Sequence, residues 1–436
     1  MAPNSSNFAH LLHDVSVYHE ERLPIELAEA CIDWLSDDLE ALYTCARVCR
    51  AWLPRSYSRR FCVLQYGDVT GSPGFLPPSA TNIVRLLDYL GENDRVCTFV
   101  RELRLRTRRD RLQLSMLRRL LSHLPHLLIC ELDGPTLNSF VSGFTYPMRP
   151  YTPKALRTLV VRAPRAARNH AELNEVLELF SDVDDLQLSL LDPHPNQADV
   201  GRRGSIRRNP GLRVSKLTLD SRFPLTAAQS LRELRFVLDK TTLSSLSCPA
   251  FGIQAIDSNA LDLFLQEHGS SLSTLNITDV AREVDHSLHL LNICPSIASL
   301  RLTVPLPVGS TWHSPNFNGG WNALCSVLWN APPSLRELYV VLDPISDDKT
   351  SPLGVHAREV LVALHTLDWS AVDRHLRRQG KACGHRLYLR IMDKQFEGVQ
   401  TLLLVAEQLV EAKLTGRVRR YVDYGLISPL ALQSVV

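Results

Sequence analysis

The sequence lacks the short motifs that mark the commonest enzyme active sites. It contains no G-x-S-x-G, no G-x-x-x-x-G-K-[ST], no G-x-G-x-x-G and no H-E-x-x-H. These patterns supply an exposed nucleophile, two kinds of phosphate-binding glycine loop and a zinc-binding helix. Adjacent carboxylates such as Asp37-Asp38 and Asp184-Asp185 occur, and we interpret them as solvated helix caps and loop residues. We therefore predict that the chain has no catalytic residues and is not an enzyme.

Metal-binding spacings are absent as well. The chain has 10 cysteines, and none are arranged as C-x2-C, a pair that is typical of structural zinc sites. The most suggestive pairs are His10-x2-His13 and Cys383-x-His385, but neither has a second pair at zinc spacing. We expect no metal ion and no cofactor, and we interpret the cysteines as buried, reduced thiols.

Neither sign of charge dominates the chain. The 48 Lys and Arg residues stand against 46 Asp and Glu residues, which gives a formal net charge of +2, whereas non-specific nucleic-acid binding needs a concentrated positive field. Residues 101–111 are rich in arginine, but Leu103 and Leu105 alternate with the arginines, as in a strand with one buried face. A second basic cluster, 202–208, surrounds Ser205, and the sequence does not decide whether that serine is phosphorylated. We expect no nucleic-acid partner.

Long hydrophobic runs are also missing. The longest run, near residues 401–410, is soon broken by glutamate and falls short of the length that crosses a bilayer. The first residues show no basic stretch before an apolar run, so we expect no secretory signal. These absences predict no membrane partner and a protein of the cytoplasm and/or the nucleus.

Near its start, the sequence contains a helical segment with a specific motif. Residues 22–61 read RLPIELAEACIDWLSDDLEALYTCARVCRAWLPRSYSRRF, and apolar residues recur at three- and four-residue spacing from Leu27 to Trp34. We predict three short helices. The first begins at Pro24, whose missing N–H costs nothing in a first helical turn, and the polar turn Ser36-Asp37-Asp38 supplies the N-cap of the second.

Two parts of this segment carry a resemblance to a known family. The sequence LPxEL at 23–27 is followed by CxxVCRAW at 45–52. Together they resemble the F-box, in the variant that is abundant in mushroom-forming fungi, over less than a tenth of the chain. An ordinary helical hairpin at the start of a larger domain is the alternative interpretation.

The resemblance implies partners and docking residues. An F-box binds the Skp1-type subunit of a cullin-based, SCF-type ubiquitin ligase, so a Skp1-type adaptor and, through it, a cullin are the implied partners. The implied docking residues, some of which must also hold the core of the module, are Leu23, Pro24, Ile25, Leu27, Ile32, Leu35, Leu42, Val48, Cys49 and Trp52.

From about residue 95 onward, one short pattern recurs: an apolar residue, two residues, leucine (once cysteine), one residue and another apolar residue. The nine copies are 100–105, 127–132, 156–161, 183–188, 214–219, 231–236, 272–277, 297–302 and 335–340, and a partial copy lies at 387–389. This pattern is typical of the strand of a leucine-rich repeat, in which alternate side chains point into a stacked core.

The segments between these copies have helical spacing, notably 112–124, 171–180, 261–268, 288–293 and 321–329. We therefore predict an α/β fold, in which a three-helix F-box precedes an irregular leucine-rich-repeat-like solenoid with a parallel sheet. The spacing of the copies is ragged and the usual asparagine ladder is missing. An ordinary α/β domain with a parallel sheet therefore stays open as an alternative.

Segments rich in glycine and proline set the expected boundaries. We expect an N-terminal segment at 1–20, the F-box at 21–65, a linker and first helix at 66–95, and the repeat array with its C-terminal cap at 96–436. A cap is expected because an open end would expose the apolar core of a solenoid.

Side chains alternate along a strand, so the residues beside each central leucine should share an exposed, mixed polar face. We predict that this face binds a target protein, because arginine and tyrosine dominate binding hot spots. The proposed target-binding residues are Glu233, Arg235, Arg301, Glu337 and Tyr339. The predicted function is substrate recognition for a ubiquitin ligase. A scaffold that assembles no ligase and, less favoured, an enzyme hidden in the α/β region are the alternatives, and the target itself is not predicted.

Overall fold

The structure is a computed structural model of the 436-residue chain. The residues that it describes are 24–67, 83–106, 111–134, 136–138, 151–163, 170–190, 211–220, 224–249, 259–278, 293–308, 321, 324–325, 332–346, 362–365, 367–370, 373–374, 386–392 and 422–427.

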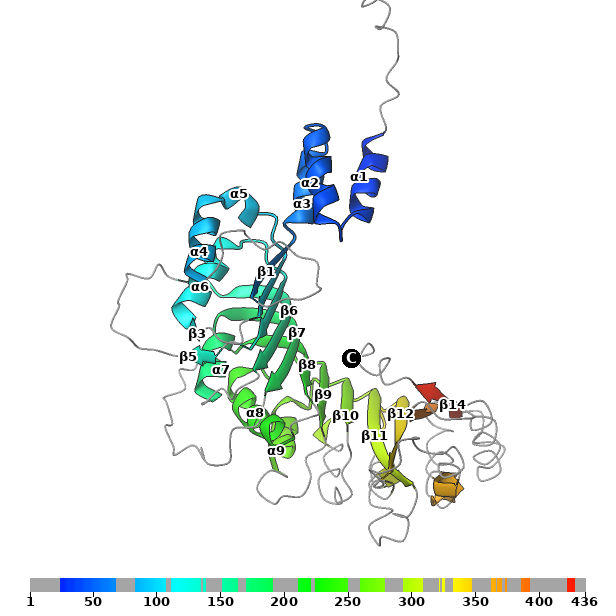
Figure 1. Ribbon diagram of the computed structural model, residues 1–436. Coiled ribbons are helices and arrows are strands. Elements are labelled where there is room, and N and C mark those ends of the chain that lie inside the picture. The colour runs from blue at the N-terminus through cyan, green and yellow to red at the C-terminus, as the bar shows by residue number, and fades with distance from the viewer. Residues whose placement is uncertain are drawn as a thin grey trace, which may run out of the picture.

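The central feature is one parallel sheet of 12 strands, in which each strand lies beside its neighbours in the sequence (Figure 1). From one edge to the other the strands are β1 (Val63–Gly67), β2 (Glu102–Arg106), β4 (Ile129–Asp133), β6 (Lys154–Ala163), β7 (Phe180–Leu190), β8 (Arg213–Leu219), β9 (Ser245–Pro249), β10 (Thr274–Thr278), β11 (Ser299–Val308), β12 (Glu337–Ser346), β13 (Arg386–Met392) and β14 (Val422–Ile427). A separate two-stranded parallel sheet consists of β3 (Arg111–Gln113) and β5 (Thr136–Asn138).

Leucines at paired positions hold neighbouring strands of the large sheet together. One row runs through Leu217, Leu246, Leu275, Leu300 and Leu338, which are register partners from β8 to β12. All five side chains are buried. Burial of one such side chain is worth about 1.5–3 kcal/mol, so the repeated leucine fixes the register of each added strand.

Helices cover the face of the sheet into which these leucines point. They are α4 (Ile83–Glu92), α5 (Asp94–Cys97), α6 (Leu114–His123), α7 (His170–Leu177), α8 (Pro224–Val237) and α9 (Asn259–His268). Their apolar sides and the strand leucines form one continuous buried core. Figure 1 shows these helices along one side of the curved sheet, so the described helices leave its opposite face uncovered.

The predicted α/β fold with a parallel sheet is confirmed, as are most of the predicted elements. Eight of the nine sequence patterns lie in or directly before strands, and the partial copy at 387–389 lies in β13. The predicted helices at 112–124, 171–180 and 261–268 correspond to α6, α7 and α9. Those predicted at 288–293 and 321–329 fall largely outside the described residues.

The strand predicted at 231–236 is wrong, because these residues belong to helix α8. Leu231 and Leu234 are buried, but they belong to a helical series with Ala227 and Ala228, and a three-residue step fits a helix as well as this strand pattern. Phe236, the last residue of the pattern, is 53% exposed. Glu233 and Arg235 therefore lie in the helical layer and not on the exposed face of the sheet.

The strand that belongs at this place in the sheet is β9, which the sequence analysis missed. Leu243, Leu246 and Cys248 repeat the same spacing and are buried. The edge strands β1 and β14 were missed too. β1 begins at Val63, inside the segment 21–65, and ends at Gly67 with φ +100°. A Cβ atom at Gly67 would lie 1.6 Å from the carbonyl oxygen of Arg106, so only glycine fits where β1 leaves β2.

Three helices precede the sheet: α1 (Ile25–Trp34), α2 (Leu39–Val48) and α3 (Leu53–Arg60). The predicted N-cap of the second helix is confirmed, because the Asp38 carboxylate accepts hydrogen bonds from the backbone N–H groups of Glu40 and Ala41, at 3.1 and 2.9 Å. Pro24 is the N-cap of α1, one position before the predicted place, and its carbonyl oxygen accepts from the N–H groups of Leu27 and Ala28.

Candidate functional site

Helix α1 exposes a stripe of apolar side chains. Leu27, Ala30, Cys31 and Trp34 recur at three- and four-residue spacing and are all exposed, Leu27 by 54% and Trp34 by 90%. We call these four residues the α1 stripe. An apolar helix face normally packs against a core, and here the core contacts of α1 come instead from Ala28 and Ile32, which are buried. The α1 stripe therefore makes no such core contact and is available to bind another molecule.

A cluster of ion pairs joins α1 to α3. The Asp33 carboxylate accepts from Nε of Arg59 and Nε of Arg55, each at 2.7 Å, and Arg55 also donates through its terminal nitrogen to the second carboxylate oxygen. Hydrogen bonds from Arg59 and then Arg55 hold the pKa of Asp33 well below its ordinary value. Because these contacts fix the orientation of α1, they also fix where the α1 stripe points.

The predicted docking residues separate into exposed and buried groups. Pro24, Ile25, Leu27, Val48 and Cys49 are exposed, Leu35 and Trp52 are partly buried, and Ile32 and Leu42 are buried. Leu23 lies outside the described residues. Ile32 and Leu42 therefore belong to the core of the three helices, whereas the exposed group is free to contact a partner directly.

Two further exposed residues were not among the predicted docking residues. Trp34 is the most exposed large apolar side chain that the structure describes, and its seven-residue separation from Leu27 was the sequence signal that could have identified it. Tyr43 on α2 is 45% exposed, and the guanidinium of Arg60 lies 4.6 Å from its ring centroid. Half of the exposed large apolar side chains in the described residues lie between Ile25 and Val48.

The three helices are attached to the sheet by aromatic packing. The Tyr57 ring on α3 meets the ring of Phe61 edge-on, with centroids 5.3 Å apart, and that of Phe99 at 6.4 Å. Phe61 is buried in the core of the sheet, and β1 follows two residues later. This short, packed connection places the three helices at the β1 end of the sheet (Figure 1).

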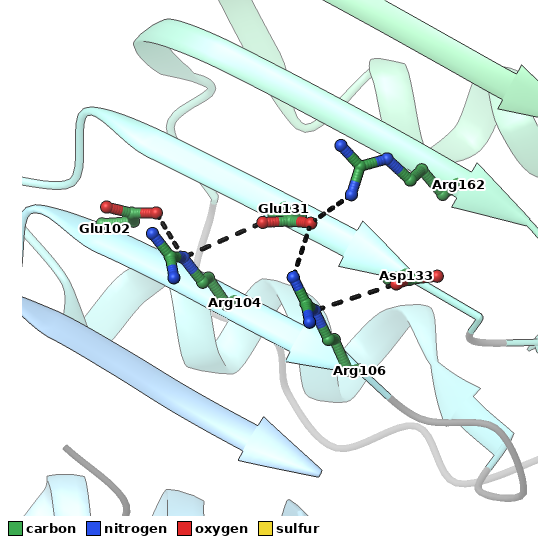
Figure 2. A network of polar contacts seen from close by, with 6 residues as sticks. All are labelled: Glu102, Arg104, Arg106, Glu131, Asp133 and Arg162. Carbon is green, nitrogen blue, oxygen red and sulfur yellow. Dashed lines mark hydrogen bonds and ion pairs between the residues drawn. The ribbon is translucent and has the colours of Figure 1, made fainter. Parts of the chain in front are cut away.

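The uncovered face of the sheet, here called the polar face, begins with a network of charged side chains on β2, β4 and β6. Glu131 lies at its centre (Figure 2) and accepts from Arg162 at 2.6 Å and from Arg106 at 3.4 Å, with Nε of Arg104 at 3.8 Å. Glu102 pairs with Arg104 at 2.5 Å, and Asp133 lies 3.8 Å from Arg106.

We call these six residues the β2–β6 network. Its three arginines and three carboxylates balance. Arg104 and Arg106 alternate with buried Leu103 and Leu105 on β2, as predicted for the arginines of 101–111, and residues 107–110 lie outside the described residues. The network therefore offers little net attraction for an anion.

Farther along the polar face, the side chains are less highly charged. Asn276, Arg301, Tyr339 and Tyr388 are register partners on four successive strands, β10 to β13. The rings of Tyr339 and Tyr388 stack with centroids 4.2 Å apart and an interplanar angle of 7°. Burial lowers the pKa of the Arg301 guanidinium.

The proposed target-binding residues are therefore not all on one surface. Arg301, Glu337 and Tyr339 lie on the paired strands β11 and β12, at positions beside the central leucines. Arg235 lies on α8, where its side chain stacks over the Phe236 ring and lies 3.8 Å from Glu267 on α9. The hypothesis that Glu233 and Arg235 share a face with Arg301 is wrong.

Among the described residues, possible metal ligands do not cluster and the cysteines differ in their exposure. No group of three or more His, Cys, Asp or Glu side chains gathers there as a metal site. Cys97, Cys130, Cys248 and Cys294 are buried as predicted, whereas Cys31 and Cys49 are exposed. Burial raises the pKa of the Cys130 and Cys248 thiols to about 12, so these two are inert protonated thiols at neutral pH.

Among the described helices, none combines the length and the apolar character needed to cross a membrane. A scan of the sequence against protein-family models finds no match, and a search of curated proteins finds none either.

Proposed function

We propose that this chain is the substrate-recognition adaptor of a cullin-based, SCF-type ubiquitin ligase. Helices α1 to α3 bind a Skp1-type adaptor, and the polar face binds a target protein. The observation that carries the proposal is the exposed α1 stripe, which lies within the same 40 residues as the F-box-like sequence motif. Exposed apolar side chains concentrated on one small module are unfavourable in water, and they typically mark an interaction site.

Two anchors dominate the proposed docking surface. Trp34 and Leu27 are the exposed large side chains of the α1 stripe, and full burial of such a side chain is worth about 1.5–3 kcal/mol. Tryptophan is enriched among the residues that carry most of the free energy of binding at interfaces. The adaptor therefore contacts α1 along Leu27 to Trp34, while Ile32 and Leu42 support the module from inside.

We further infer that the sheet and its helices form an irregular leucine-rich-repeat-like solenoid. The parallel strands in sequence order and the row of stacked leucines support this inference. In such a fold each repeat adds one strand to a continuous exposed face, which suits a protein target. The protein then performs no covalent chemistry. It raises the rate of ubiquitin transfer by holding a target lysine near an enzyme on other subunits, in the cytoplasm and/or the nucleus.

The adaptor site is tested by a double substitution, Leu27→Ala with Trp34→Ala. Binding of the full chain to a purified Skp1-type adaptor, measured by calorimetry, should weaken by about 100-fold or more, because two anchors are lost together. The melting temperature should stay unchanged, since both side chains are exposed in the free chain.

The matched control is Leu128→Ala with Phe236→Ala, because these side chains are 47% and 53% exposed but lie far from α1 in the sequence. This control should bind the adaptor normally. Full binding by the α1 double variant would contradict the proposed docking surface. Adaptor binding without recovery of a cullin would favour the scaffold that assembles no ligase.

A further inference from the structure

Arg301 differs from the described arginines of the β2–β6 network in its surroundings. Arg104, Arg106 and Arg162 each lie within 3.8 Å of at least one carboxylate oxygen. Arg301 is partly buried, and no ion pair to it is present among the described residues. Its Nε atom is covered and has no hydrogen-bond partner there. A partly buried cation without an anion is unfavourable.

The strand register explains why no carboxylate lies directly opposite Arg301 on either neighbouring strand. Its partner on β10 is Asn276 and its partner on β12 is Tyr339, whereas the β4 partner of Arg104 is Glu131. Two positions away along β11 on either side are Ser299 and Thr303. The groups directly opposite and next along the strand are therefore an amide, a phenol and two hydroxyl groups, all of them neutral at pH 7. Glu337 is diagonal to Arg301, opposite Ser299, and no ion pair joins the two among the described residues.

Asn276 is held in place on its other side. Its Nδ2 donates to the Ser247 hydroxyl oxygen at 3.0 Å, while its Oδ1 has no partner among the described residues. Asn276 is 8% exposed. Its amide is therefore held in a fixed orientation beside Arg301 and is uncharged.

The stacked tyrosines provide an aromatic surface on the β12 side of Arg301, away from Asn276. Tyr339 and Tyr388 are partly exposed, and their parallel rings present an aromatic platform next to a cation. Tyrosine and arginine are the side-chain types that carry most of the binding free energy at protein interfaces. A peptide would find a cation and an adjoining aromatic surface at the spacing of neighbouring strands, about 4.8 Å.

We propose that Arg301 is a carboxylate-binding subsite, which takes an Asp or Glu side chain from an acidic segment of a partner protein while a neighbouring residue of that segment lies on the Tyr339–Tyr388 platform. The subsite deepens the proposed function and rests on it, since it names the chemistry of the target that the polar face would recognise. A guanidinium binds a carboxylate through two parallel hydrogen bonds, so the acidic side chain supplies an anion to Arg301, whose Nε has no hydrogen-bond partner among the described residues.

A carboxylate suits this subsite better than a phosphate does. One guanidinium and one carboxylate make a neutral pair, and the desolvation of both ions is then offset by their attraction. A phosphorylated residue carries close to two negative charges at pH 7, and it would leave an unbalanced charge in a partly buried place.

Synthetic peptide pools test the subsite directly. Each pool consists of random-sequence decapeptides in which one position is fixed as Asp, Glu, Asn, Gln or phosphoserine, and retention on the immobilised full chain is measured. The wild-type chain should retain the Asp or Glu pools about ten-fold more than the matched Asn or Gln pools, as expected for a charge-assisted hydrogen bond.

Three variants identify the residue responsible. Arg301→Gln should remove the preference for acidic pools, and Arg301→Lys should keep part of it, since the charge stays but the paired donor geometry is lost. Arg162→Gln is the matched control on the same face and should keep the full preference. Melting curves of all three establish that they are folded.

The proposal is overturned if the wild-type chain does not prefer acidic pools, if Arg301→Gln retains the preference, or if phosphoserine is favoured over Asp and Glu. Adaptor binding, measured in parallel, separates this result from the proposed function. Arg301→Gln should bind the Skp1-type adaptor normally, and a chain that prefers acidic pools but binds no adaptor would refute the ligase role and leave the subsite standing.

Discussion

At the scale of single residues, α1 carries apolar side chains on two sides. Ala28 and Ile32 face the other helices and are buried, whereas Leu27 and Trp34 are exposed. A helix with apolar residues on both sides is expected to be buried all round, yet only the side of α1 with Ala28 and Ile32 is buried, and Asp33 joins α1 to α3 by ion pairs. One apolar side of α1 is buried within the protein and the other is exposed, and the exposed side is the candidate docking surface.

Replacement of Asp33 by asparagine should lower stability in a pH-dependent way. Hydrogen bonds from Arg59 and Arg55 lower the pKa of Asp33 in the folded state, so its contribution to stability is present above the unfolded-state pKa of about 4 and is lost as the pH falls below it. Because the side chains are partly exposed, we expect Asp33→Asn to cost up to about 1 kcal/mol at pH 7.

Chemical denaturation of both proteins between pH 7 and pH 3 measures this contribution. The difference in unfolding free energy between wild type and Asp33→Asn should shrink as the pH falls below about 4. A constant difference across this range would show that the ion pairs do not hold α1. Glu26→Gln, which removes an exposed carboxylate from the first turn of the same helix and has no ion pair to α3 among the described residues, serves as the control.

At the scale of elements, α8 packs its leucines against the sheet, and Leu234 tests that packing. Leu234 is fully buried, so Leu234→Ala should open a cavity and destabilise the protein by about 2–5 kcal/mol in a denaturant titration. Phe236→Ala removes a larger but exposed side chain from the same helix and should cost less than about 0.5 kcal/mol. Equal costs for the two variants would contradict the packing of α8.

The error at α8 shows how far the sequence predicts this fold. The alternation of Leu103 and Leu105 with arginine defines a strand because no helix places such residues on one face. The pattern at 231–236 contains the same single alternating step but is followed by apolar Val237, where Arg106 follows Leu105. The residues that complete its helical series, Ala227 and Ala228, lie upstream. The local spacing of apolar residues therefore predicts most of the parallel strands. The prediction fails where a three-residue spacing is compatible with both a strand pattern and a helix.

The candidate sites were predictable to different degrees. The motif from Leu23 to Trp52 located the proposed docking module, but it could not separate exposed Leu27 from buried Ile32, because that depends on which side of α1 meets α3. Similarly, Arg301 was placed on the exposed face by alternation, whereas the absence of a carboxylate directly opposite it depends on strand register. Register follows from tertiary packing over about 30 residues of intervening chain, which the local pattern does not contain.

Over the whole molecule, the polar face divides into two parts with different electrostatics. Near the three helices, the β2–β6 network balances three arginines with three carboxylates around Glu131. Toward β11, Arg301 has no ion pair among the described residues. We infer that an arginine without an ion pair attracts acidic peptide segments to this face. Removal of the Glu131 carboxylate should therefore create a second binding site for such segments in the β2–β6 network.

Glu131→Gln tests this reasoning. Glu131 is only 12% exposed and contacts all three arginines, so the substitution should cost about 1–3 kcal/mol in unfolding free energy. Arg162, which has no other carboxylate partner among the described residues, is left unpaired. The variant should therefore retain acidic peptide pools more strongly than the wild type, and this gain should persist when Arg301→Gln is added.

Asp133→Asn provides the matched control, because Asp133 lies 3.8 Å from Arg106 and is the most exposed carboxylate of the network. Its loss should change stability by less than about 0.5 kcal/mol and leave peptide retention near the wild-type level. A Glu131→Gln chain that is folded but gains no retention would mean that pairing of arginines does not decide where acidic segments bind, and the shape of the Tyr339–Tyr388 platform would then be the determinant to examine.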